Sequence, residues 1–415
     1  MAMQARPHVL IAAISARALT QLAVVAGYRV TVIDAYADED TCALVEQVLT
    51  VSCDERGFEA AAFAAALTQL DTSSMTGMVY GSGFEARPEV LELAQAFLAV
   101  LGNGADVVRR CKQPQHFFPL LQTLDLPYPA TRLPEAGQEG WSTIKPAAGD
   151  AWLYKRGGGC GGLHVQPADK VSSMADDAYL QRKLAGRTLS LLFVADGHDM
   201  QPVGVHAQWW SPGTHAPYRY GGAVSLNQER PACYPALLQA AQTLTRALGL
   251  RGLNGIDVIE HGPLAAELET GSGAFPQRQA EAGFHLLELN PRPTATVTLY
   301  PAQPGQSDLF SLHMAACQGV LLTAPSCSAV HAHAVVYAVH AVTIPAGLHW
   351  PPWVSDIPSA GSCIATDSPL CSVHASADDA AAAHALVQQQ LAEMQAWLHL
   401  GLSVANDNNN DTEHD

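Results

Sequence analysis

The feature that most constrains the fold is an alternation of apolar strand and amphipathic helix at the start of the chain. Residues 8–14 (HVLIAAI) form a short continuous apolar run, which is typical of a strand buried on both faces. Residues 15–27 (SARALTQLAVVAG) have a helical pattern, with Ser15 as a suitable N-cap and Gly27 as a suitable end. A second apolar run, 28–35 (YRVTVIDA), predicts the next strand. Strand, helix and strand in about thirty residues form a βαβ unit, so we expect a parallel α/β layer here.

The composition excludes several classes of protein. A chain of 415 residues with 48% hydrophobic residues suggests two or three domains with their own cores. A net charge of −17 argues against nucleic acid as the main partner. The nine cysteines are an odd number and are scattered without a CxxC pair, which favours reduced thiols in a cytoplasmic protein over disulfides or a zinc site. Because no stretch reaches 18 uninterrupted apolar residues, we expect no membrane partner.

A glycine-rich segment follows a predicted strand in the middle of the chain. Residues 152–165 (WLYKRGGGCGGLHV) place Lys155 at the end of the strand, and five glycines follow within six positions. These are Gly157, Gly158, Gly159, Gly161 and Gly162. A hairpin turn needs fewer glycines, so this pattern indicates a loop whose backbone N–H groups approach phosphate oxygens. A flexible glycine tip with an incidental lysine is the alternative. The spacing is not that of a P-loop.

A second polar pattern lies along residues 286–300 (LLELNPRPTATVTLY). Glu288, Asn290 and Arg292 occupy every second position, so on a strand they share one face. The oxygens of a Glu and an Asn can hold a hard cation such as Mg²⁺, and an Arg beside them can neutralise anionic oxygens. The alternative is a solvated strand face that ends at a proline turn. Asp257 lies on another predicted strand, 252–260 (GLNGIDVIE).

The order of these features resembles the ATP-grasp superfamily over roughly residues 8–322. The resemblance implies an α/β (α+β) fold with an N-terminal parallel α/β layer, a glycine-hairpin lid, an antiparallel-sheet catalytic domain and a small β-rich C-terminal region. The expected divisions are 1–105 for the N-terminal α/β domain, 106–186 for the lid subdomain, 187–322 for the catalytic subdomain, 323–402 for the C-terminal region with a final helix, and 403–415 for a disordered tail.

The resemblance also implies roles for individual residues. Lys155 matches the lysine that contacts the phosphates of ATP, and the five glycines match the hairpin that covers them. Arg292 matches the arginine that faces the transferred phosphoryl group. The segment that binds adenine matches Gln181, Arg182 and Leu184, and the Mg²⁺ ligands match Asp257, Glu288 and Asn290.

Two further lysines are candidates for phosphate contact. Lys112 matches the first lysine of the superfamily, although Cys111 stands where an Asp is usual. Lys145, in the segment TIKPAAG, has no glycine loop behind it, so Lys155 is preferred.

Two residues are candidates for the substrate side of the site. Arg219 lies in the loop 209–224 (WWSPGTHAPYRYGGAV), where it could bind the acceptor carboxylate bidentately; ordinary packing of a large loop is the alternative. Glu85 follows the glycine turn in 81–85 (GSGFE), and a surface position is favoured over one in the cleft.

The segments VVAGYRV and VYGSGFEARPEVLELAQAFLAVLGN look most like a subgroup of predicted ATP-dependent ligases distantly related to biotin carboxylase. The resemblance implies ATP and Mg²⁺ as cofactors, with Mn²⁺ as an alternative. It also implies an enzyme that joins a small-molecule carboxylate to an amine through an acyl phosphate. Some relatives join glutamate to an aromatic amine in the synthesis of one-carbon carrier cofactors. A carboxylase that uses bicarbonate and a catalytically silent nucleotide-binding regulatory module are the alternatives. A homodimer is a candidate assembly.

Overall fold

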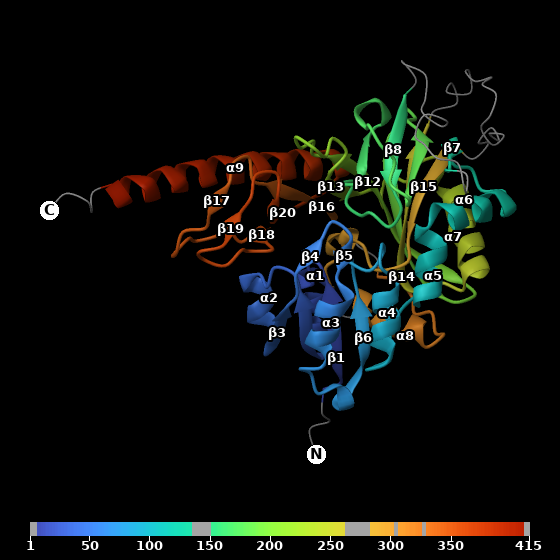
Figure 1. The fold of residues 1–415 in the computed structure, drawn as a ribbon, viewed down its shortest axis with the longest axis horizontal. Coiled ribbons are helices and arrows are strands. Elements are labelled where there is room, and N and C mark those ends of the chain that lie inside the picture. Colours follow the sequence, from blue (N-terminus) through green and yellow to red (C-terminus); the bar gives the residue numbers. More distant parts are fainter. Residues whose placement is uncertain (1–5, 135–150, 262–282, 303–305, 326–328, 411–415) are drawn as a thin grey trace.

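The structure is a computed structural model that describes residues 6–134, 151–261, 283–302, 306–325 and 329–410. An N-terminal α/β unit lies beneath a large antiparallel sheet, and a smaller sheet stands at the far end of the molecule (Figure 1). No helix in the described part of the chain is long and apolar enough to cross a membrane.

The N-terminal unit is a four-stranded sheet in the order β3-β2-β1-β6, and its strands are parallel. The strands are β1 His8–Ala13, β2 Arg29–Asp34, β3 Gln47–Thr50 and β6 Met75–Tyr80. The helices of this unit are α1 Arg17–Val25, α2 Glu39–Leu44, α3 Ala60–Leu67 and α4 Glu89–Gln95. The unit also contains a short hairpin, β4 Cys53–Asp54 and β5 Gly57–Phe58, and the 3-10 turn η1 Thr72–Ser74. All six residues of β1 are buried, and the predicted parallel α/β layer is confirmed.

Two details of this unit differ from the sequence prediction. The pattern of residues 89–103 (EVLELAQAFLAVLGN) favours one helix, but α4 ends at Gln95, and Met78 of β6 hydrogen-bonds to Ala99 and Leu101 beyond it. Ser15 does not cap α1. The helix begins after Ala16, whose N–H donates to Asp34 Oδ2 at 2.6 Å.

The smaller sheet carries the glycine-rich segment. Its strand order is β7-β10-β8-β9, and neighbouring strands are antiparallel. The strands are β7 Thr131–Arg132, β8 Trp152–Arg156, β9 Val165–Pro167 and β10 Ala178–Arg182, with the 3-10 turn η3 Ala168–Lys170 after β9. Two helices precede it, α5 Ala105–Lys112 and α6 Pro114–Thr123. The glycines therefore form the connection between β8 and β9.

The large sheet has eight strands in the order β15-β14-β11-β12-β13-β16-β20-β18, each antiparallel to its neighbours. The strands are β11 Arg187–Asp196, β12 Met200–Trp210, β13 Tyr220–Ser225, β14 Arg251–Glu260, β15 Phe284–Asn290, β16 Val330–Tyr337, β18 Val354–Ser355 and β20 Pro369–Ala377. Around it lie α7 Tyr234–Leu248, α8 Leu309–Cys317, the 3-10 helix η4 Ala295–Leu299, and the pair β17 Val342–Thr343 and β19 Cys363–Ile364. The antiparallel sheet is confirmed, and the C-terminal strands extend it through β16.

The last helix is longer than predicted. The expected divisions place the final helix within 323–402 and a disordered tail from 403, but α9 runs Ala380–Asn410. No proline interrupts this segment, so the helical hydrogen bonding can continue through its polar end. Its buried residues Ala383, Val387 and Met394 belong to the core cluster beside β16 and β20, and its far end projects past the body of the molecule (Figure 1).

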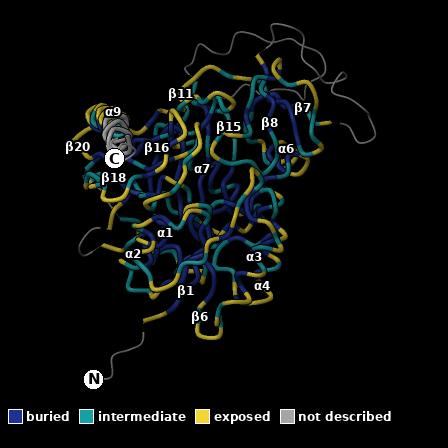
Figure 2. The backbone as a smooth tube through the Cα atoms, turned by 60° about the vertical axis from the view of Figure 1, so that its left-hand side comes forward, coloured by how far each residue is buried: buried dark blue, intermediate teal, exposed yellow. Residues whose placement is uncertain are grey.

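A shared core holds the N-terminal unit against the large sheet. One cluster of buried side chains joins Val9 and Ile11 of β1 to Leu192 and Val194 of β11 and to Phe310 of α8. Buried residues run without interruption through the middle of the molecule (Figure 2). The ends of β6 and β15 therefore face one another across a packed junction.

Candidate active site

The predicted acidic strand edge is assembled from two neighbouring strands. In the antiparallel pair β14 and β15, Asp257 lies opposite Glu288, and Asn290 Nδ2 donates to Asp257 Oδ2 at 2.8 Å. Arg292 lies two residues after Asn290. Its backbone N–H donates to the carbonyl of Asn290 at 2.8 Å, and the chain turns at this hydrogen bond. All four side chains line one cavity.

Lys112 also reaches this edge, from the last residue of α5. Its Nζ donates to Asn290 Oδ1 at 2.7 Å and to the Glu288 carboxylate, and the residue is only 6% exposed. An ammonium group thus lies among oxygens of two of the predicted metal ligands. This arrangement shows that the oxygen cluster accommodates a cation, so the residues present fit a hard metal ion such as Mg²⁺.

The two carboxyl groups differ in their electrostatics. Burial raises the pKa of Asp257, and the neighbouring Glu288 raises it further. Burial also acts to raise the pKa of Glu288, but the charge of Lys112 outweighs it and the pKa of Glu288 is lowered. Two buried carboxylates side by side repel one another, and this repulsion is relieved by a positive charge between them.

Lys155 projects into the same cavity from β8. Its Nζ donates to Gln181 Oε1 on the neighbouring strand β10 at 2.7 Å, and Gln181 donates onward to Thr131 Oγ1 at 3.3 Å. Burial lowers the pKa of Lys155 to about 8. The predicted hinge residues Gln181, Arg182 and Leu184 line the cavity together with Lys183.

The glycine hairpin lies close against two other parts of the chain. A Cβ on Gly158 would come within 2.4 Å of Ala86 Cα, and a Cβ on Gly162 within 2.0 Å of the carbonyl oxygen of Tyr218. Both glycines have φ +73, where other residues are strained. Tyr220 N–H donates to the carbonyl of Gly161 at 2.9 Å. These close approaches explain the glycines better than a flexible tip does.

The glycines line two neighbouring hollows. Gly161 and Gly162 line the cavity that contains Lys155 and the acidic strand edge. Gly157, Gly158 and Gly159 line a small adjoining hollow that also touches Lys112 and Glu288.

Glu85 is not the surface acid that the sequence favoured. It is 4% exposed, its carboxylate accepts from Arg292 Nε, and it also accepts from the N–H groups of Gly83 at 2.7 Å and Phe84 at 2.9 Å. Burial acts to raise the pKa of Glu85, but Arg292 and Lys112 outweigh it and the pKa is lowered. A glycine turn directly precedes Glu85, and its backbone N–H groups need acceptors. This turn is the sequence signal from which a buried position for Glu85 could have been predicted.

Arg219 does not occupy the predicted substrate position. Its Nη1 donates to the Asp367 carbonyl at 2.7 Å and lies 3.2 Å from the Asp367 carboxylate, and its guanidinium stacks 3.5 Å above the ring of Tyr337. Among the described residues, it is absent from the lining of both large cavities, whereas its neighbours Tyr218 and Tyr220 line the first. Arg219 therefore ties its loop to the C-terminal strands. Lys145 lies outside the described residues.

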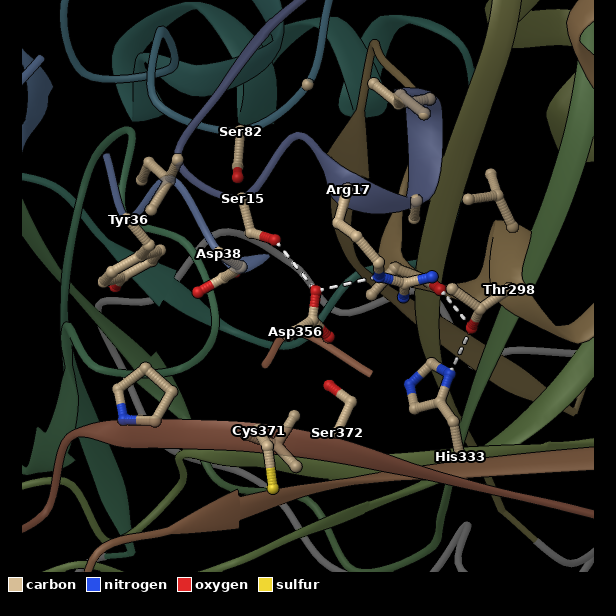
Figure 3. Close-up of a pocket in the computed structure, with 18 of the residues that line it drawn as sticks. Ser15, Arg17, Tyr36, Asp38, Ser82, Thr298, His333, Asp356, Cys371 and Ser372 are labelled. Carbon is tan, nitrogen blue, oxygen red and sulfur yellow. Dashed lines mark hydrogen bonds and ion pairs between the residues drawn. The ribbon is translucent and has the colours of Figure 1, made fainter. Parts of the chain in front are cut away.

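Two cavities meet at Arg292. The first, of about 440 Å³, extends from the hinge to the acidic strand edge, a volume suited to a small-molecule ligand. The second, of about 300 Å³, lies between α1 and the C-terminal strands (Figure 3). The residues that border both are Ser82, Arg292, Thr294, Ala295, Val335 and Pro369.

Comparisons with known proteins agree with this geometry. Residues 118–296 match the family model described as an ATP-grasp domain. That range includes Lys155, the hairpin and the acidic strand edge, and Lys112 lies just before it. No curated protein sequence matches the chain.

Several solved structures share the fold over nearly the whole chain. The biotin carboxylase domain of a single-chain bacterial carboxylase has a TM-score of 0.64 and 20% identity, with 95% of this chain and 93% of that chain covered. An ADP complex of N5-carboxyaminoimidazole ribonucleotide synthetase has a TM-score of 0.62 and 13% identity, with 95% and 100% covered. An L-amino acid ligase from Bacillus licheniformis has a TM-score of 0.62 and 12% identity, with 94% and 98% covered. Residues 118–296 therefore match an ATP-grasp domain, and the fold of the chain as a whole resembles that of a biotin carboxylase domain and of an L-amino acid ligase.

Proposed function

We propose that the protein is an ATP- and Mg²⁺-dependent ligase that activates a carboxylate as an acyl phosphate and joins it to an amine. ATP-grasp enzymes use ATP together with Mg²⁺, and the structural relatives include ligases that form C–N bonds. The observation that carries the proposal is one cavity lined by the side-chain oxygens of Asp257, Glu288 and Asn290 and by the cations of Lys155 and Arg292.

Different residues would bind the metal ion and the phosphate groups of a triphosphate. Asp257, Glu288 and Asn290 would hold the metal, and when bound, ATP with Mg²⁺ supplies the phosphoryl group that activates the carboxylate. Lys155 and Arg292 would neutralise the phosphate oxygens, because both are buried cations that line the cavity.

Two further features prepare the site for a reactive intermediate. The Glu85 carboxylate fixes the orientation of Arg292 at the point where the two cavities meet. The glycine hairpin already contacts the N-terminal unit and the Tyr218 loop, so it can exclude water from an acyl phosphate.

The second half of the reaction joins the amine to the activated acid. The nitrogen attacks the acyl carbon, the C–N bond forms, and the bond from carbon to the phosphate oxygen breaks. An ammonium substrate must first lose a proton to free its lone pair, so the overall products are the amide, hydrogen phosphate and one proton. We propose glutamate and an aromatic amine, from the synthesis of one-carbon carrier cofactors, as the first pair to test, because the N-terminal segments resemble ligases of that kind.

The experiment measures ADP release with acids and amines tested singly and in pairs. A ligase releases ADP when a matching acid and amine are present together. Release with bicarbonate and biotin instead would favour the carboxylase alternative. ATP binding without release for any pair would contradict the ligase and favour a regulatory module.

A matched pair of lysine variants separates catalysis from general charge effects. Lys155→Ala should reduce ADP release about a hundredfold, because removing one phosphate-facing cation costs on the order of 3 kcal/mol in the barrier. Lys170→Ala removes an exposed lysine from the same subdomain and should leave the rate unchanged. Equal rates in the two variants would refute the role of Lys155.

A further inference from the structure

The second cavity is mostly apolar and has walls from both ends of the chain. Its apolar lining includes Leu19 of α1, Val297 of η4, Ile364 of β19 and Leu370 of β20. At one side it opens to Arg292, which also borders the first cavity. A ligand that fits this space has an apolar body and reaches the point where the phosphates would lie.

Asp38 is one of several ionisable residues in this lining, with Arg17, Asp356, His333 and His374 among the others. It lies directly before α2, it is 6% exposed, and it lines the cavity. No hydrogen bond or ion pair joins its carboxylate to any residue that the structure describes, and Figure 3 draws it without a contact. Burying a carboxylate without a partner is unfavourable, so Asp38 is either protonated or paired with a cation from outside the chain, and it lines a cavity that could hold such a cation.

The other ionisable groups around this cavity are already neutral or paired. Arg17 Nε donates to Asp356 Oδ1 at 3.0 Å, so that cation has its own carboxylate. Burial lowers the pKa of His333 to about 3 and that of His374 to about 4, which keeps both rings neutral near pH 7. At the Arg292 end, the guanidinium is paired with Glu85.

We propose that this cavity binds the amine substrate and that Asp38 pairs with its ammonium group. The inference rests on the proposed ligase function. A protonated primary amine carries a positive charge and three N–H donors, which match an unpartnered carboxylate, and its carbon body matches the apolar walls. A carboxylate substrate brings no N–H donor to this position, and it would be repelled whenever Asp38 is ionised. Asp38 is thus the residue that selects which of the two substrates enters here.

The ionisation of Asp38 supports this assignment. Burial raises the pKa of Asp38 to about 8, and Asp356, Asp34 and Asp40 raise it further, whereas Arg17 lowers it. At pH 7 the empty carboxyl is mostly protonated, and a bound cation favours its charged form. The affinity for an amine should therefore increase as the pH rises from 6 to 8, by up to about tenfold per unit.

The test is isothermal titration of the full chain with benzylamine, 2-phenylethylamine and hexylamine, each compared with the alcohol of the same shape. At least one amine should bind at least about tenfold more tightly than its alcohol, with an affinity that rises between pH 6 and pH 8. Asp38→Asn should weaken that binding about 10- to 100-fold and remove the pH dependence. Asp169→Asn, which removes an exposed acid, should do neither.

Each contrary result has a defined meaning. If every amine binds no better than its alcohol, or if Asp38→Asn keeps both amine affinity and ATP binding, the assignment is wrong. Should the variant fail to fold, the amine–alcohol comparison and the pH dependence of the unmodified protein decide. ATP binding and ADP release are measured separately, so failure of the ligase function is distinguished from failure of the amine site.

Discussion

Arg292 donates a hydrogen bond from Nε to the carboxylate of Glu85, which lies 207 residues earlier in the chain. Glu85 follows the glycine turn after β6, and Arg292 follows β15, so the pair joins the N-terminal sheet to the strand that carries the predicted metal ligands. Both side chains are buried. The contact therefore sets the position of a buried cation where the two cavities meet.

Replacing Glu85 by Gln should reduce the rate of ADP release by about tenfold or more, because Arg292 loses the charge that orients it. It should also lower the free energy of unfolding by about 3–5 kcal/mol, since a buried guanidinium is left without its partner. Urea unfolding and steady-state kinetics measure the two effects. Glu89→Gln, at an exposed position on α4, is the control. A Glu85→Gln protein with normal rate and stability would show that the pair is unimportant.

Two glycines of the hairpin offer a matched comparison. Gly158 and Gly161 have φ +73 and +63, but a Cβ on Gly158 would meet Ala86 Cα at 2.4 Å, whereas a Cβ on Gly161 has nothing within 4 Å. Both alanine variants carry about 1 kcal/mol of backbone strain, and only Gly158→Ala must also push the hairpin away from the N-terminal unit. We expect ATP affinity to fall at least about tenfold further in Gly158→Ala, measured by titration. Equal affinities would contradict the closed hairpin.

Metal dependence tests the acidic strand edge. Asp257→Asn removes one anionic ligand from the cluster with Glu288 and Asn290, so half-maximal ADP release should require at least about tenfold more Mg²⁺. Glu260→Gln is the control on the same strand, because Glu260 pairs with Arg187 instead. Chelation of Mg²⁺ should abolish ADP release in the unmodified protein. Identical Mg²⁺ curves for the two variants would remove Asp257 from the metal site.

The pair of Arg17 and Asp356 joins α1 to the C-terminal strands and should make stability depend on pH. Burial acts to raise the pKa of Asp356, but Arg17 outweighs it and the pKa is lowered to about 2. Because the folded-state pKa lies below the unfolded value, this contribution is full above about pH 4 and is lost as the pH falls toward 2.

Asp356→Asn should therefore lower the free energy of unfolding by roughly 2 kcal/mol at pH 7, and the difference from the unmodified protein should shrink below pH 4. Urea unfolding at pH 7, 4 and 3 measures it. A difference that stays constant over this range would mean that the stabilisation does not come from the ionised carboxylate.

The sequence predicted the parts of the site that lie close together along the chain. Glu288, Asn290 and Arg292 follow the two-residue period of a strand, and Lys155 precedes its glycines directly. The parallel layer was visible because β1 and β2 are short apolar runs separated by one helix.

Contacts between distant segments could not be predicted in the same way. No spacing rule connects Arg219 to Asp367, or Glu85 to Arg292, since these pairs form only when segments far apart in the sequence come together in the fold. The unpartnered state of Asp38 likewise depends on the neighbours that the fold places around it. Pattern reasoning therefore identified the residues that we propose for nucleotide binding and missed the wall built by the C-terminal strands.

The most direct test of the central claim is a crystal structure of the full chain with a non-hydrolysable ATP analogue and Mg²⁺. We expect the triphosphate in the first cavity, in contact with Lys155 and Arg292, with Mg²⁺ bound by Asp257, Glu288 and Asn290. A nucleotide bound elsewhere, or in this cavity without metal on those three residues, would contradict the claim.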